Sequence, residues 1–193
     1  MKHRKILSLS AFAVMAIMAF AGSASATVIK KDGVNMTAGE AISASVSSSW
    51  LLKTGGGTTI ATCTEGSTGG SLSNAGGASL TVHISITITT VSKCNTTVDT
   101  LANGTWELHY RPLFHLSITS TGAKTTVNFL GVSCVFETKS TEVGTLTGGK
   151  PATVDASGTI PGISGFPCPS SAILSGGYTV TSPGGSTLDG AES

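Results

Sequence analysis

Strict alternation of apolar and polar side chains over residues 81–91 constrains the fold of this chain more than any other feature. The segment reads TVHISITITTV, and Val82, Ile84, Ile86 and Ile88 follow one another at a spacing of two. Side chains two apart lie on the same face of a β-strand. Antiparallel sheets commonly bury one face and expose the other to water. The segment therefore predicts a strand of an antiparallel β protein.

The rest of the chain has the same character. Thr, whose branched Cβ suits strands, is abundant, as are Gly and Ser, which favour turns. No segment combines helical spacing with capping residues. We expect further strands, with Trp106 and Tyr178 among their apolar faces, at residues 105–110, 113–119, 125–130, 132–138, 141–147, 152–160 and 171–181. We expect loops at residues 53–57, 65–77 and 161–169, which are rich in Gly, Ser or Pro.

About eight to ten short strands on one chain are typical of a sandwich or a barrel. We expect a single all-β domain over residues 27–181. The fold class that we predict is an antiparallel β-sandwich, immunoglobulin-like in general architecture, with two disulfides. Residues 182–193 are polar and predict a flexible tail.

The first 26 residues have the features of a signal peptide. Residues 1–5 are basic, residues 6–22 are apolar, and Ser23-Ala24-Ser25-Ala26 supplies small residues for cleavage after Ala26. The alternative is a retained membrane anchor, although an apolar run of about 17 residues is at the short limit for spanning a bilayer. No later run is as apolar and as long. We therefore expect no membrane span after signal cleavage.

The charge of the chain argues against polyanionic partners. Its formal net charge is +1 and only 11% of its residues are charged. Three of the basic residues lie in the predicted signal peptide, so the exported chain is close to neutral. Binding to nucleic acid or to anionic lipid depends on clustered positive charge. We expect no nucleic-acid partner.

The chain has four cysteines, all of which follow the predicted signal peptide: Cys63, Cys94, Cys134 and Cys168. In an oxidising compartment an even set of cysteines pairs, and four allow three connectivities. We favour Cys63–Cys94 and Cys134–Cys168, each of which closes a loop of about 30 residues, and leave the other pairings open. None of the cysteines forms a C-x-x-C motif, so zinc is not expected.

The order of these cysteines and their flanks resembles an uncharacterised family of short exported proteins, mainly actinobacterial. Members are rich in Ser, Thr and Gly and contain four cysteines. The segments that carry the resemblance are Ala24–Val28, Thr62-Cys63-Thr64, Cys94, Gly104–Leu108, Gly131–Phe136, Cys168-Pro169 and Gly177–Pro183. The resemblance covers most of the exported chain. It implies an exported, disulfide-bonded β domain and no activity, so it assigns no functional residues.

Three residues are candidates for metal binding. Glu107 and His109 are two apart on a predicted strand, and a turn at residues 111–112 would bring His115 across the hairpin. A Glu and two His on one exposed face can hold a divalent metal. The alternative is an ordinary solvated strand face. No known metal motif has this spacing, so we predict neither a metal nor any other cofactor.

No residue is predicted to be catalytic. The G-x-S-x-G nucleophile elbow is missing. A triad would have to combine His83, His109 or His115 with Asp99 or Asp155, and nothing in the sequence links them. Asn103-Gly104 predicts a turn. Trp50 is either an anchor of the core or part of an exposed aromatic patch.

The leading hypothesis is a secreted or cell-surface, non-enzymatic β domain with a structural or binding role. Its partner would be a cell-wall polymer or another surface protein. One alternative is a secreted hydrolase of a cell-wall or extracellular polymer, which a pocket holding Glu107, His109 or Asp99 together would favour. Another alternative is a strand-donating subunit of a surface polymer, which predicts that the strand at residues 27–37 has no partner.

Overall fold

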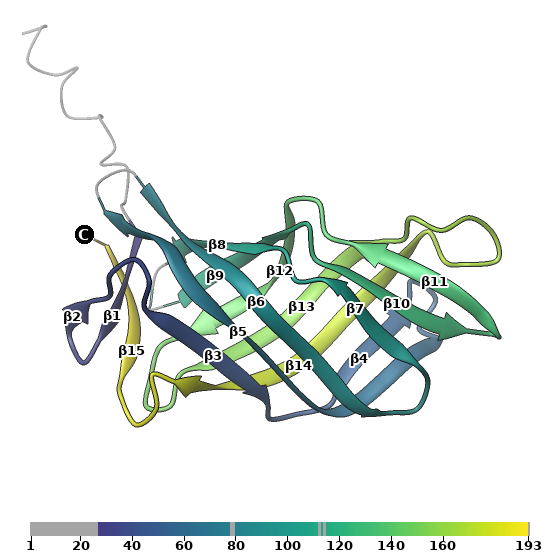
Figure 1. The fold of residues 1–193 in the computed structure, drawn as a ribbon, viewed down its shortest axis with the longest axis horizontal. Helices are drawn as coiled ribbons and strands as arrows, with labels where there is room; N and C mark the ends of the chain where they lie inside the picture. The colour runs from purple at the N-terminus through teal and green to yellow at the C-terminus, as the bar shows by residue number, and fades with distance from the viewer. Residues whose placement is uncertain (1–26, 78–79, 112, 114, 193) are drawn as a thin grey trace, which may run out of the picture.

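A computed structural model describes residues 27–77, 80–111, 113 and 115–192 (Figure 1). The predicted signal peptide, residues 1–26, lies outside the described residues. The strands are β1 (Thr27–Lys31), β2 (Val34–Asn35), β3 (Ala41–Val46), β4 (Trp50–Thr54), β5 (Thr59–Gly77), β6 (Leu80–Cys94), β7 (Val98–Ala102), β8 (Thr105–Arg111), β9 (His115–Thr121), β10 (Lys124–Phe129), β11 (Val132–Glu137), β12 (Thr141–Thr147), β13 (Thr153–Pro161), β14 (Ser171–Ser182) and β15 (Leu188–Glu192). Within this part of the chain, no helix has the length and hydropathy needed to cross a membrane.

Eight antiparallel strands form a closed barrel. Their order is β5-β3-β14-β13-β12-β9-β8-β6, and the pairing of β5 with β6 closes the ring. Strand β4 continues the line of β3, because it also pairs with β14 and β5. The predicted β-sandwich is therefore wrong. A sandwich has two sheets with open edges, whereas here the first and last strands of one sheet pair with each other.

The closure depends on a segment that the sequence suggested to be a loop. Residues 65–77 belong to β5, a strand of 19 residues that pairs with β6 along almost its whole length. Gly66, Gly69 and Gly70 lie in this strand close to the backbones or side chains of its neighbours. The glycines that suggest a loop thus allow β5 to approach both neighbouring strands closely.

A β-bulge interrupts the alternation of β6. Ile86 pairs with Gly70 and Ile88 pairs with Gly69, which leaves Thr87 without a partner in the ladder. The extra residue reverses the faces beyond it, so Ile88 is 52% exposed and Thr89 turns toward the interior. The prediction that Ile88 shares the buried face of Ile86 is therefore wrong.

A three-stranded sheet, β11-β10-β7, extends the barrel wall at one end. Its order matches that of the barrel strands β12-β9-β8, and each small strand joins its barrel counterpart through a short kink. The kinks fall at residues 103–104, 122–123 and 138–140. They lie side by side, since the Gly122 N–H donates to the Thr138 carbonyl and the Thr138 N–H donates to the Ala123 carbonyl.

Strands β1, β2 and β15 lie at the other end of the molecule (Figure 1). The buried side chains of Ile29 and Leu188 join the barrel core there. The structure thus places Leu188–Glu192 in a strand rather than in the predicted tail, because Leu188 is buried and β15 pairs with β1. The Thr187 N–H donates to Asp32 Oδ1 over 2.8 Å. This backbone hydrogen bond is the main cause that lowers the pKa of the Asp32 carboxyl, and a hydrogen bond from the side chain of Ser186 lowers it further.

The favoured disulfide pairing is confirmed. Cys63–Cys94 joins β5 to β6, and Cys134–Cys168 joins β11 to the loop between β13 and β14. The described residues contain no free cysteine. Two intramolecular disulfides indicate an oxidising environment.

Candidate binding cavity

Two cavities lie inside the barrel, and a third adjoins them between the barrel and the small sheet. The deep cavity, of about 20 Å³, is lined by Ile42, Ser43, Ala44, Thr68, Gly69, Ile84, Ile86, Trp106, Leu108, Ile118, Leu146, Val154 and Val180. The inner cavity, of about 140 Å³, is lined by Trp50, Thr68, Thr89, Asn103, Trp106, Ile118, Ser120, Ala123, Thr138, Val143, Val154, Ala156, Ile160, Leu174 and Tyr178. The side cavity, of about 100 Å³, is lined by Trp50, Thr89, Val91, Val98, Thr100, Ala102, Asn103, Ala123, Lys124, Thr125, Phe136, Thr138, Ile160 and Tyr178.

Shared residues connect these spaces. Trp106 lines both the deep and the inner cavity, and Trp50 and Asn103 line both the inner and the side cavity. The side cavity lies between β6 and β7, which are consecutive but share no ladder. The three cavities are thus neighbours, and the series extends from the barrel interior to the junction with the small sheet.

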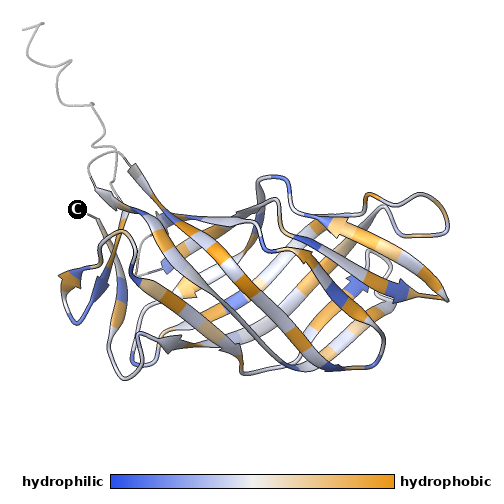
Figure 2. Cartoon of the chain, viewed as in Figure 1, coloured by the Kyte–Doolittle hydropathy of each residue, from blue (hydrophilic) through white to orange (hydrophobic). Residues whose placement is uncertain are grey.

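Alternation along the barrel strands aims the lining side chains inward. On β13, Val154, Ala156 and Ile160 are buried, whereas Asp155 is exposed. Figure 2 shows this alternation of hydrophobic and hydrophilic residues along the barrel strands. Small side chains such as Ala156 leave the middle of the barrel unfilled. An eight-stranded barrel is wide enough to be filled by side chains or to hold one small ligand.

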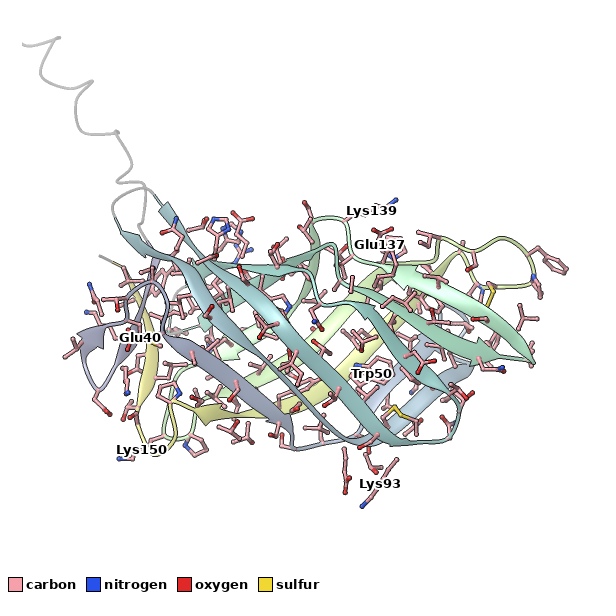
Figure 3. The ribbon with its side chains drawn as sticks, viewed as in Figure 1. Glu40, Trp50, Lys93, Glu137, Lys139 and Lys150 are labelled. Carbon is pink, nitrogen blue, oxygen red and sulfur yellow. A yellow bond between two sulfur atoms is a disulfide. The ribbon has the colours of Figure 1, made fainter. Side chains whose placement is uncertain are left out.

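Trp50 occupies the centre of the region between the barrel and the small sheet. Figure 3 shows it inside the outline of the barrel, whereas Lys93, Lys139 and Lys150 project from the rim. Its side chain is only 8% exposed and lines both larger cavities. Trp50 is therefore part of the interior, which agrees with the interpretation of this residue as an anchor of the core.

Most polar groups around the inner cavity have protein partners. The hydroxyls of Ser120 and Thr138 lie 3.0 Å apart, and the Ala123 N–H donates to Thr138 Oγ1 over 3.0 Å. The hydroxyls of Thr68 and Thr89 lie 3.3 Å apart. These hydrogen bonds leave the cavity wall largely apolar in character.

Asn103 is the exception. Its Nδ2 donates to the Thr87 carbonyl, the group that the bulge leaves out of the ladder, over 2.9 Å. Its Oδ1 is buried and has no hydrogen-bond partner among the described residues. A buried polar atom without a partner is rare in folded proteins. Asn103 Oδ1 is thus the one buried side-chain acceptor in the described residues whose hydrogen-bonding capacity is unused.

Among the described residues, no charged side chain lines the inner cavity. Lys124 lines the side cavity, and its Nζ lies 3.6 Å from Glu137 Oε1. Transfer of a charge into an apolar interior is costly unless the charge is paired. The inner cavity therefore suits an uncharged molecule.

Burial raises the pKa of the Tyr178 phenol to about 12. In the variant Tyr110→Phe, Tyr178 is the only tyrosine. We expect the absorbance of this variant at 295 nm to show the Tyr178 phenol titrating with a midpoint of about 12. The raised pKa means that the folded state favours the neutral phenol of Tyr178. The contribution of this phenol to the free energy of unfolding is therefore complete below about pH 10 and is lost as the pH rises from about 10 to 12. A midpoint near 10 with an unchanged near-UV circular dichroism spectrum would contradict the burial of Tyr178.

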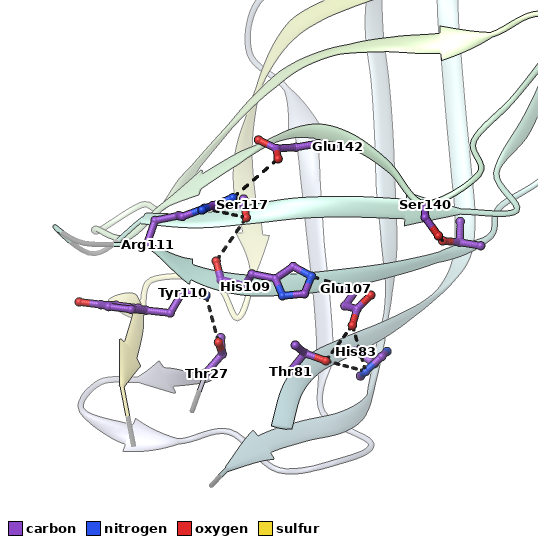
Figure 4. Close-up of polar contacts among 11 residues, drawn as sticks. Thr27, Thr81, His83, Glu107, His109, Tyr110, Arg111, Ser117, Ser140 and Glu142 are labelled. Carbon is purple, nitrogen blue, oxygen red and sulfur yellow. Dashed lines mark hydrogen bonds and ion pairs between the residues drawn. The ribbon is translucent and has the colours of Figure 1, made fainter. Parts of the chain in front are cut away.

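The metal candidates lie on the outside of the barrel, away from the cavities (Figure 4). Glu107 lies between two histidines: its Oε2 is 3.8 Å from His109 Nε2 and its Oε1 is 3.9 Å from His83 Nε2. His115 is not part of this cluster, since it pairs with Arg111 and its Nδ1 lies 2.9 Å from Thr147 Oγ1. Among the described residues, no three His, Cys, Asp or Glu side chains are placed to hold a metal ion.

The residues proposed for a hydrolase do not lie together, and the strand proposed as a donor is paired. Asp99 and Asp155 are exposed on β7 and β13. None of the three cavities is lined by Asp99, Glu107 or His109. Strand β1 has partners in β15, β2 and β5. Within the part of the chain that the structure describes, these three cavities do not gather the residues expected of the hydrolase, and β1 is not the unpaired strand expected of the strand donor.

Sequence reasoning missed the cavity and the role of Asn103 in its wall. The alternation of apolar and polar residues along the predicted strands placed Trp106 and Tyr178 on inward faces. This pattern was the one signal in the sequence for aromatic side chains inside the barrel. The Asn103-Gly104 pair reads as an ordinary turn, because the bulge at Thr87 that it completes is not visible in the sequence.

Neither a family model nor a curated protein nor a solved structure matches this chain.

Proposed function

We propose that this chain is an exported, non-enzymatic protein that binds a small, uncharged, largely apolar molecule inside its barrel. The observation that carries this proposal is the inner cavity of about 140 Å³, which is lined by apolar side chains and by no charged group. In another protein, an apolar cavity of about 150 Å³ binds benzene. The inner and side cavities together offer room for a molecule somewhat larger than benzene.

Export to a secreted or cell-surface location is supported by two features. The signal-peptide pattern of residues 1–26 predicts translocation. The two disulfides join segments 31 and 34 residues apart and suit an oxidising compartment. The resemblance to short exported four-cysteine proteins agrees with this location. A cell-wall polymer or a surface protein is a less favoured partner, because the cavity accepts a small molecule and not a chain.

Binding can be tested on oxidised protein comprising residues 27–193. Calorimetry is the suitable measurement, because indole absorbs and emits light in the same range as the two tryptophans that line the inner cavity. We expect saturable heat signals with bicyclic aromatic probes such as indole and benzofuran. Failure of every such probe to bind the folded protein would contradict the proposal.

A cavity-filling variant locates the binding site. Ala156→Leu adds volume inside the inner cavity and is expected to weaken probe binding tenfold or more. Ala41→Leu makes the same change at an exposed position of β3 and is expected to leave binding unchanged. Equal binding by both folded variants would place the probe outside the barrel and would contradict the proposed site.

A further inference from the structure

We propose that the bound molecule is an uncharged aromatic compound with a hydrogen-bond donor, and that Asn103 Oδ1 accepts that hydrogen bond. This inference rests on the proposed function and specifies its ligand. Three observations carry it: the unused acceptor on Asn103, the aromatic side chains around the same cavity and the lack of charge in its wall. Phenols and heteroaromatic rings with an N–H group belong to this class.

The orientation of the Asn103 amide is fixed by its surroundings. The Thr87 carbonyl can only accept a hydrogen bond, so the amide nitrogen must face it, and Nδ2 lies 2.9 Å from that oxygen. The amide oxygen is then the atom left without a partner. The bulge at Thr87 holds the amide from one side. Because Oδ1 is enclosed in the structure, a ligand in the cavity reaches it only when neighbouring side chains of the wall move aside.

Asn103 also lies at the right place in the cavity system. It lines both the inner and the side cavity, so a molecule in either space passes close to it. Trp50 and Tyr178 line the same two cavities, and Trp106 lines the inner one. Aromatic rings favour offset or edge-to-face packing against other aromatic rings. A flat ring with one donor therefore matches both the aromatic lining of the site and the acceptor of Asn103 that has no partner.

The neutral groups around the acceptor exclude competing ligand classes. A carboxylate or phosphate would find no cation in the inner cavity, and its desolvation would not be compensated. In the side cavity the charge of Lys124 is already paired with Glu137, 3.6 Å away. An ammonium group would find no carboxylate there. A pure hydrocarbon would fit but would leave Asn103 Oδ1 unsatisfied, and a buried polar group left unpaired lowers affinity.

A matched pair of ligands tests the proposal on the wild-type protein. Indole and benzofuran have nearly the same shape, but only indole has a hydrogen-bond donor. We expect indole to bind about five to ten times more tightly, which is the effect of one net hydrogen bond. Indole should also shift the side-chain amide resonances of Asn103 in nuclear magnetic resonance spectra clearly further than benzofuran does, because both ligands lie beside Asn103 but only indole donates a hydrogen bond to its Oδ1.

Two variants assign the preference to a residue. Asn103→Leu removes the acceptor and is expected to abolish the preference for indole while benzofuran still binds. Thr89→Val removes a hydroxyl from the same cavity wall but keeps Asn103, and it is expected to retain the preference. If Asn103→Leu fails to fold, the comparison of the two ligands on the wild-type protein and the Asn103 resonances still decide the question.

The outcomes separate this inference from the proposed function. Tight binding of both ligands with equal affinity would overturn the hydrogen bond to Asn103 but would leave a barrel that binds apolar molecules. A preference for indole that survives in folded Asn103→Leu would overturn that hydrogen bond in the same way. Failure of both ligands to bind would instead overturn the proposed function itself.

Discussion

Removal of the disulfide between β5 and β6 by Cys63→Ala/Cys94→Ala is expected to lower the free energy of unfolding substantially. The two cysteines are 31 residues apart in the sequence, and the loop-entropy model gives about 3–4 kcal/mol for a loop of this size. Cys63 is fully buried and lies opposite Cys94 in the ladder that closes the barrel. The substitution therefore affects the pairing on which barrel closure depends.

The second disulfide provides the matched comparison. Cys134→Ala/Cys168→Ala opens a loop of similar size, with a separation of 34 residues, but it connects the small sheet to the loop after β13. That contact also includes a bridge between Phe136 and Gly162. The Ile163 N–H donates to the Val135 carbonyl, and the Val135 N–H donates to Ser164 Oγ.

The two double variants should therefore differ in which strands lose protection from hydrogen exchange. Loss of Cys134–Cys168 should raise hydrogen exchange mainly in β10 and β11, whereas loss of Cys63–Cys94 should raise it throughout the barrel. Guanidinium denaturation and hydrogen exchange of both variants measure this difference. A change of less than about 1 kcal/mol in the Cys63–Cys94 variant would show that the ladder closes the barrel without covalent help.

The predictions from sequence succeeded where structure is determined by local pattern. The hairpin of β8 and β9 and the part of β6 up to Ile86 follow from alternation over a few residues. The disulfide pairing is confirmed as well. Each of these features involves residues that are close in sequence or share a simple spacing.

The barrel itself could not be predicted in this way. Its closure depends on β5, whose glycines and serines have low strand propensity and suggest a loop. In the structure, long-range pairing with β3, β4 and β6 overrides that local preference. When residues 65–77 are taken as a loop, the other predicted strands cannot close a ring. The sequence therefore suggested a sandwich, whose two sheets have open edges.

The candidate site was missed for a related reason. A cavity forms where opposing side chains fail to fill the barrel, so it depends on strands that are distant in sequence. The unused acceptor of Asn103 exists only because β6 contains a bulge next to the kink between β7 and β8. The exposed cluster of Glu107 and His109 was easier to notice because its members are two residues apart on one strand.

Gly70→Ala is expected to cost about 3 kcal/mol or more, or to prevent folding, because a side chain there would collide with backbone. A Cβ at this position would lie 1.9 Å from the Ser85 carbonyl oxygen and 2.9 Å from the Ile86 Cα. Neither atom belongs to a flexible side chain that could move away. Strand β6 would have to shift at the bulge, and the shift would disturb both the β5–β6 ladder and the hydrogen bond between Asn103 and Thr87.

Gly55→Ala is the matched control, since a Cβ at this turn position meets nothing within 4 Å. We expect that variant to stay within about 0.5 kcal/mol of the wild type in guanidinium denaturation. Expression of the two variants in parallel separates a folding defect of Gly70→Ala from a general loss of yield. If Gly70→Ala folds with wild-type stability, the backbones of β5 and β6 are further apart than this close approach requires. The acceptor of Asn103 would then be less firmly positioned, because the same bulge holds it in place.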